Sequence, residues 1–73
     1  MNMLTENEKT LIKLLAAIGI REDVAIGASC GLDDCQLDEF IEFVIERHEE
    51  GNDVTEEDVV KAHLILLREA GKI

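Results

Sequence analysis

Apolar side chains recur at helical spacing in four stretches of this chain, and each stretch ends at a glycine or a short polar break. Spacings of three and four residues put such side chains on one side of an α-helix, where they can face a common core. The pattern predicts helices over residues 6–18, 22–30, 34–50 and 56–70. Because the breaks are short, we expect a single helical domain over residues 1–73: an all-α, compact bundle of four short helices, the second being the shortest.

Local signals mark the ends of these helices. A hydroxyl or carboxylate just before a helix, with an acid or amide three residues later, can accept hydrogen bonds from free backbone N–H groups at the helix start. Three such pairs occur: Thr5 with Glu8, Asp33 with Gln36, and Thr55 with Asp58. Glycine follows the end of each helix, at positions 19, 31, 51 and 71. After the first of these glycines, we expect Ile20 to fold back onto Leu15.

The second helix has the weakest local signals. Acidic residues fill its first turn, but the small residues Gly27, Ala28 and Ser29 lower its helix propensity. Small side chains also let another backbone come close, so we expect a tight helix crossing here. An irregular turn is the alternative.

The predicted core draws on the first, third and fourth helices. It comprises Leu11, Leu15, Ile18, Leu37, Ile41, Val44, Leu64 and Leu67. The fourth helix has more apolar positions than one stripe needs, so it is either central to the bundle or exposes a second apolar face. Val60 and Ile65 are the candidate partner-binding residues on that second face.

The outward side of the third helix is predicted to be a dense anionic strip, relieved mainly by Arg47. Its candidate partner-binding residues are Asp34, Asp38, Glu39, Glu42 and Glu46. The whole chain has 17 acidic and 7 basic residues, for a formal charge of −10. This charge repels nucleic acid and anionic membranes and attracts a basic protein partner. Trp and Tyr are absent and there are only two Phe, so stacking surfaces for bases and aromatic cofactors are scarce, and we expect no cofactor.

Residues 22–45 have the order of a helix-turn-helix: a short helix with small residues, a glycine turn at Gly31 and a second apolar-faced helix. The residues at the interior positions of that motif are Ile26, Cys30, Leu32, Leu37 and Phe40. This third of the chain therefore resembles the helix-turn-helix superfamily in a degenerate form. The resemblance implies that the third helix enters the DNA major groove, yet its outward residues are acidic and DNA would repel them.

Other candidate sites have simpler structural interpretations. Cys30, Cys35 and His48 have the spacing C-x4-C-x12-H, which overlaps the start of a zinc finger, but His63 comes fifteen residues later and no strands are predicted. We expect both cysteines to serve in core or turn packing and both histidines to be structural, with no metal bound. The acidic segment 49–58 lacks the alternating ligand order of a calcium loop and the glycine required at its sixth position. Paired carboxylates occur without a neighbouring nucleophile or phosphate loop, so we expect no enzyme.

The N-terminal residues lack the cationic start and apolar core of a secretory signal, and no stretch approaches the roughly 20 apolar residues of a membrane span, so we expect a cytoplasmic protein without membrane contact. The combined acidic and apolar faces favour a small adaptor or regulatory module that binds a basic protein. The alternative is a helix-turn-helix-related transcription regulator or its dimerisation part. The broad apolar sector of the fourth helix also predicts a homodimer.

Overall fold

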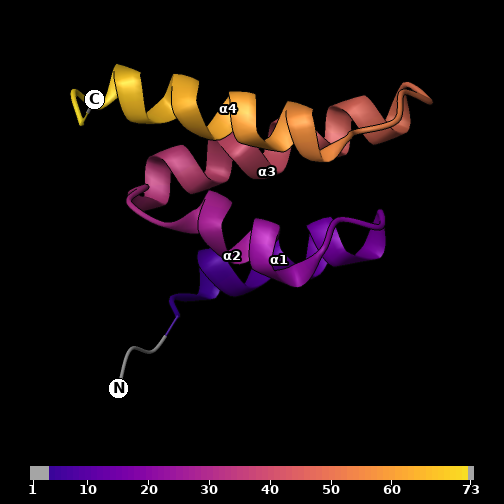
Figure 1. Ribbon diagram of the computed structural model, residues 1–73, viewed down its shortest axis with the longest axis horizontal. Helices are drawn as coiled ribbons and strands as arrows, with labels where there is room; N and C mark the ends of the chain where they lie inside the picture. The colour runs from indigo at the N-terminus through magenta and orange to yellow at the C-terminus, as the bar shows by residue number, and fades with distance from the viewer. Residues whose placement is uncertain (1–3, 73) are drawn as a thin grey trace.

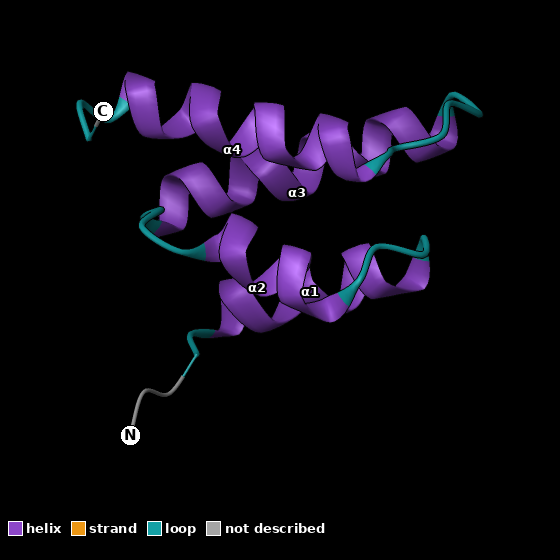
Figure 2. Ribbon diagram, in the orientation of Figure 1, coloured by secondary structure: helices purple, strands orange, loops and turns teal. Residues whose placement is uncertain are grey.

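The helices begin and end close to the positions that the capping signals predict. The computed structural model describes residues 4–72, and within that range it contains α-helices and no strand. The helices are α1 (Glu6–Ala17), α2 (Glu22–Ser29), α3 (Asp34–Glu49) and α4 (Glu56–Glu69) (Figure 1; Figure 2). The all-α prediction is confirmed. Each predicted helix extends one residue too far, because its last residue forms the C-terminal cap instead.

All three predicted capping boxes form. At the start of α3, the Gln36 backbone N–H donates to the Asp33 carboxylate (2.9 Å), and the Asp33 N–H donates to the Gln36 side-chain oxygen (3.3 Å). At the end of α1, Gly19 has a φ of +93°, and Ile20 turns back so that its N–H donates to the Leu15 carbonyl (3.0 Å). Ile20 is buried there, as predicted.

Helix α2 is a true helix, although no side chain caps its start. Ala25, Ala28 and Ser29 are its buried residues, so small side chains do allow close packing on this side. Gly27 does not take part as predicted, because it is exposed and a Cβ atom added to it would meet nothing within 4 Å. It lies on the opposite side of α2 from the buried residues, since it follows Ala25 by two positions.

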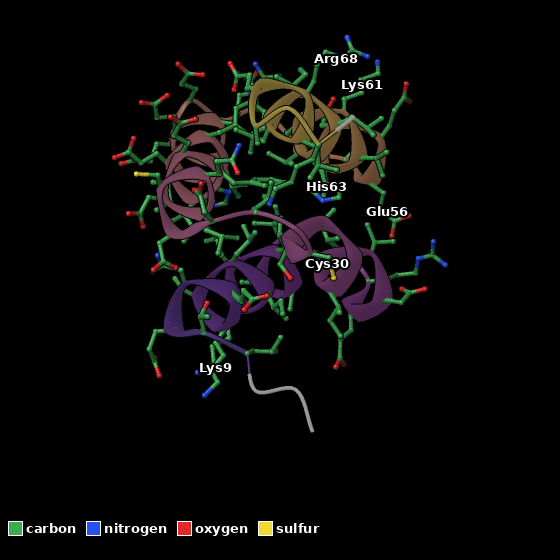
Figure 3. The ribbon with its side chains drawn as sticks, turned by 90° about the vertical axis from the view of Figure 1, so that its left-hand side faces the viewer. Lys9, Cys30, Glu56, Lys61, His63 and Arg68 are labelled. Atoms are coloured by element: carbon green, nitrogen blue, oxygen red, sulfur yellow. The ribbon has the colours of Figure 1, made fainter. Side chains whose placement is uncertain are left out.

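The four helices form a ring in which each packs on two neighbours. Helix α1 contacts α2 and α3, and α4 contacts α2 and α3. Figure 3 looks along the bundle and shows α1 and α2 as the lower pair, with α3 and α4 above them. Helices α2 and α3, which follow one another in the chain, therefore lie on a diagonal across the core.

This diagonal changes the interpretation of residues 22–45. The order of helix, glycine turn and helix is present, but α2 packs mainly on α1 and α4. Leu37 and Phe40 are buried as expected, whereas Ile26 and Cys30, predicted to be interior, are exposed. They point outward because Ala25, Ala28 and Ser29 occupy the inward side of α2.

The core confirms most of the predicted set. Leu11, Leu15, Leu37 and Val44 are almost fully buried, and Ile18, Ile41 and Leu67 are half-buried. Leu64 was wrongly predicted, because 45% of it is exposed. The inward residues of α4 are Val59 and Leu66. The apolar sector of α4 is wide enough to allow either stripe, and packing against its neighbours selects this one.

Candidate partner-binding site

Helices α3 and α4 pack less closely than the other neighbouring pairs, and an open groove lies between them. We call it the α3–α4 groove; its volume is about 310 Å³. Its walls are mostly apolar and are formed by Phe40, Phe43, Ala62, Ile65 and Leu66. Three charged residues complete the lining, namely Glu39 from α3 and Asp58 and Lys61 from α4. The groove thus combines apolar walls with a charged rim.

Gln36 joins the two helices at one end of this arrangement. Its side-chain N–H donates to the Leu66 carbonyl oxygen (2.7 Å), and its side-chain oxygen accepts from the Asp33 N–H (3.3 Å). The same amide therefore completes the cap of α3 and ties α3 to α4. The Leu66 carbonyl also accepts from the Ala70 N–H (3.0 Å), so it accepts two hydrogen bonds, one within α4 and one from Gln36.

Arg47 occupies the part of α3 that faces the start of α4. Its guanidinium carbon lies 5.7 Å from the centre of the Phe43 ring, a distance typical of a cation–π contact. Its Nε atom is buried and is the one buried side-chain nitrogen or oxygen in residues 4–72 without a hydrogen-bond partner. Arg47 also contributes to lowering the pKa of Asp58, although the main cause is the hydrogen bond that Asp58 accepts from the Thr55 backbone N–H. Arg47 is thus held beside Phe43, and in the described range it forms no ion pair with the acidic residues of α3.

The five candidate acidic residues of α3 are all exposed: Asp34, Asp38, Glu39, Glu42 and Glu46. None of them forms an ion pair within the part of the chain that the structure describes. Asp38, Glu42 and Glu46 are spaced four residues apart, so they are neighbours on the helix surface and their like charges repel one another. An approaching cation would relieve that repulsion. Of the five, Glu39 lines the α3–α4 groove.

The structure separates the two candidate apolar residues of α4. Ile65 is 58% exposed and lines the groove, whereas Val60 is 48% exposed and does not line it. Five residues correspond to a rotation of about 140° around an α-helix, so the two side chains lie on different flanks of α4. They do not form one continuous strip.

Four residues of the groove were not predicted as core, cap or site residues: Phe43, Lys61, Ala62 and Leu66. A usable signal was present, because Phe43 follows Phe40 by three positions and Ile65 follows Ala62 by three. Each pair therefore extends the buried stripe of its helix toward one flank. Only the pairing of α3 with α4 shows that the two flanks face each other.

The other flank of α4 is held against α2 and the turn that follows it. Arg21 donates from Nε to the Glu56 carboxylate at 2.9 Å, and this contact raises the pKa of Arg21 and lowers that of Glu56. Farther along, His63 Nε2 lies 2.8 Å from the Cys30 carbonyl oxygen, and Lys72 donates to the Gly31 carbonyl. Since a carbonyl only accepts, His63 carries its proton on Nε2. These contacts position α4 while the flank that faces α3 stays open.

The cysteines and histidines do not assemble into a site. Cys30 and Cys35 are exposed free thiols, which corrects the prediction of core packing, although Cys30 does lie at the turn after α2. His48 is exposed near the end of α3, and His63 is half-buried against the Cys30 carbonyl. In residues 4–72, no three His, Cys, Asp or Glu side chains lie close enough to hold a metal ion.

No helix in the described range is both long enough and apolar enough to cross a membrane. Comparisons with protein-family models, with curated proteins and with solved structures found no match to this chain.

Proposed function

We propose that this chain is a protein-binding module without catalytic activity, and that it binds a basic protein through α3 and the α3–α4 groove. The observation that carries the proposal is the open apolar groove of about 310 Å³ beside the exposed carboxylates of α3. Apolar pockets with charged rims are typical of protein–protein interfaces. Side chains buried in the pocket supply most of the affinity, and the charges speed the association of the two proteins and orient them. A net charge of −10 adds a long-range attraction for cationic partners.

The helix-turn-helix-related regulator stays an alternative. Its DNA-reading surface would be the outward side of α3, where Asp38, Glu42 and Glu46 are exposed. Three carboxylates on that face would repel phosphates. The same charges favour a basic protein, so the acidic module is the preferred proposal.

Affinity capture from the native cell, with paired variants, tests the proposal. Ile65→Gln removes an exposed apolar residue from the groove, while Val60→Gln makes a similar change on the other flank of the same helix. We expect a basic protein to be retained by the wild type and by Val60→Gln and to be lost from Ile65→Gln. Circular dichroism confirms that each variant is folded.

A second pair of variants tests the charges. One variant neutralises Asp38, Glu39, Glu42 and Glu46, and its control neutralises four exposed acids away from the groove, namely Glu6, Glu22, Asp23 and Glu69. Both lose the same charge, so only a local role of α3 makes the first lose the partner while the second keeps it. Capture should also weaken above a few hundred millimolar salt. Binding to heparin or duplex DNA at low salt would contradict the proposal.

A further inference from the structure

The two sides of the α3–α4 groove carry different charges. Glu39 stands on the α3 side, with Glu42 and Glu46 exposed farther out on the same helix. Lys61 stands on the α4 side, and Figure 3 shows Lys61 and Arg68 on the same outer side of α4. A partner lying in the groove therefore meets anions along the α3 flank and both signs of charge along the α4 flank.

Glu57 and Asp58 balance the charges of Lys61 and Arg68, so the α4 side is close to neutral while the α3 side is acidic. Glu57 pairs with Lys61 across one turn of the helix at 3.1 Å, and both side chains are largely exposed, so this pair is weak. The carboxylate of Asp58 accepts from the Thr55 N–H at the helix start (3.2 Å), and this bond lowers the pKa of Asp58, so its negative charge stays at that end of the groove. Lys61 is thus the charge that a partner meets midway along this wall.

The walls also restrict the backbone of the occupant. Both are helices, whose backbone N–H and C=O groups are bonded within the helix, so the groove offers no free edge to an extended strand. A strand bound here would leave its own backbone groups unpaired against apolar side chains, at a considerable cost. An α-helix satisfies those groups internally and presents side chains alone.

The length of the groove suits such a helix. Along α4 it runs from Asp58 to Leu66, which at a rise of 1.5 Å per residue is about 12 Å. Apolar anchors at positions i, i+4 and i+7 of a bound helix span about 10 Å. Two turns of a partner helix therefore match the apolar walls.

We propose that the occupant of the α3–α4 groove is an amphipathic helix of a basic protein, with Lys or Arg on the flank over α3 and neutral or acidic residues on the flank over Lys61. This inference rests on the proposed function and adds the class and charge pattern of the partner. A second copy of this chain is disfavoured because it carries the same net charge of −10, which repels an identical chain.

Two synthetic helical peptides test this charge pattern. Both carry Leu at i, i+4 and i+7; the two-sided peptide has Lys on one flank and Glu on the other, and the all-Lys peptide has Lys on both. Each is titrated against the full chain by calorimetry at low salt. Lys61→Glu makes the α4 wall acidic. We therefore expect it to lower the affinity of the two-sided peptide about threefold and to raise that of the all-Lys peptide about threefold, which is the effect expected of one surface ion pair.

Lys9→Glu is the matched control, since Lys9 is an exposed lysine of α1 at the opposite edge of the molecule from Lys61 (Figure 3). It makes the same change in net charge away from the groove, so it should slightly raise the affinity of the all-Lys peptide and leave that of the two-sided peptide, whose charges balance, almost unchanged. Ile65→Gln should lower the affinity of both peptides severalfold, which would show that both bind in the groove.

The remaining outcomes separate the two proposals. If both peptides bind but respond to Lys61→Glu as they do to Lys9→Glu, the charge pattern is overturned and the basic-partner function stands. If neither peptide binds while a basic protein is still captured through Ile65, the helical occupant is overturned. If sedimentation shows a dimer that Ile65→Gln dissociates, the occupant is a second copy. If neither peptides nor basic proteins bind, the proposed function itself fails.

Discussion

Gln36 provides a sharp test of how α3 and α4 are held together. Its side-chain oxygen accepts from the Asp33 N–H, and its side-chain nitrogen donates to the Leu66 carbonyl at 2.7 Å. Glu at the same position is an equally good partner in a capping box. Gln36→Glu therefore keeps the cap, removes the donor to α4 and places a carboxylate beside a carbonyl oxygen.

The expected change follows from these contacts. Loss of the hydrogen bond to Leu66 costs about 1 kcal/mol, and a partly buried carboxylate facing an acceptor costs about 1 kcal/mol more. The added negative charge in the first turn of α3 stabilises the variant by about 0.5–1 kcal/mol through the helix dipole. The net loss is about 1 kcal/mol in the free energy of unfolding, which for a domain of this size lowers Tm by about 4–8 °C.

Thermal and urea unfolding followed by circular dichroism at pH 7 measure this loss. Glu8→Gln is the matched control, because Glu8 holds the same position in the capping box of α1 and has no hydrogen bond to another helix in the described range. That exchange removes a negative charge from the first turn of α1, so it should cost about 0.5–1 kcal/mol and thereby measures the helix-dipole contribution separately. Below about pH 4 the carboxyl of Gln36→Glu is protonated and can donate again, so its deficit relative to wild type should shrink. A Gln36→Glu variant as stable as wild type at pH 7 would refute the bridge between α3 and α4.

Two further pairs of substitutions test the packing of α4 and of the turn after α2. Leu66→Ala should cost about 2–5 kcal/mol by urea unfolding because Leu66 is only 7% exposed, whereas Leu64→Ala, at a residue 45% exposed, should cost less than half as much; equal losses would contradict the observed core. Gly31→Ala should destabilise by about 1–2 kcal/mol, because Gly31 has a φ of +79° and a Cβ there would lie 3.3 Å from Leu67 Cδ2. Gly27→Ala adds a methyl group in open space on a helix and should stabilise the protein by about 0.5–1 kcal/mol in thermal unfolding. Stability changes of the same sign for Gly27→Ala and Gly31→Ala would be inconsistent with the structure.

The sequence by itself determined where the helices lie. Thr5 with Glu8, Asp33 with Gln36 and Thr55 with Asp58 act over three residues, and the resulting hydrogen bonds are present in the structure. Such signals can be recognised without tertiary contacts because all their partners are local. The exposure of the acidic side of α3 was equally accessible, since an unpaired carboxylate is too costly to bury.

Only the tertiary structure decided which sides of the helices meet. Leu64 and Leu66 are equally apolar, yet Leu66 is buried and Leu64 is exposed, because the positions of α2 and α3 fix the rotation of α4. The same rotation puts Ile65 in the groove and Val60 on the other flank. Long-range packing also places α2 and α3 on a diagonal and leaves α3 and α4 far enough apart for a groove. Helix ends depend on hydrogen bonds between near neighbours, whereas the binding surface depends on packing between residues far apart in the chain.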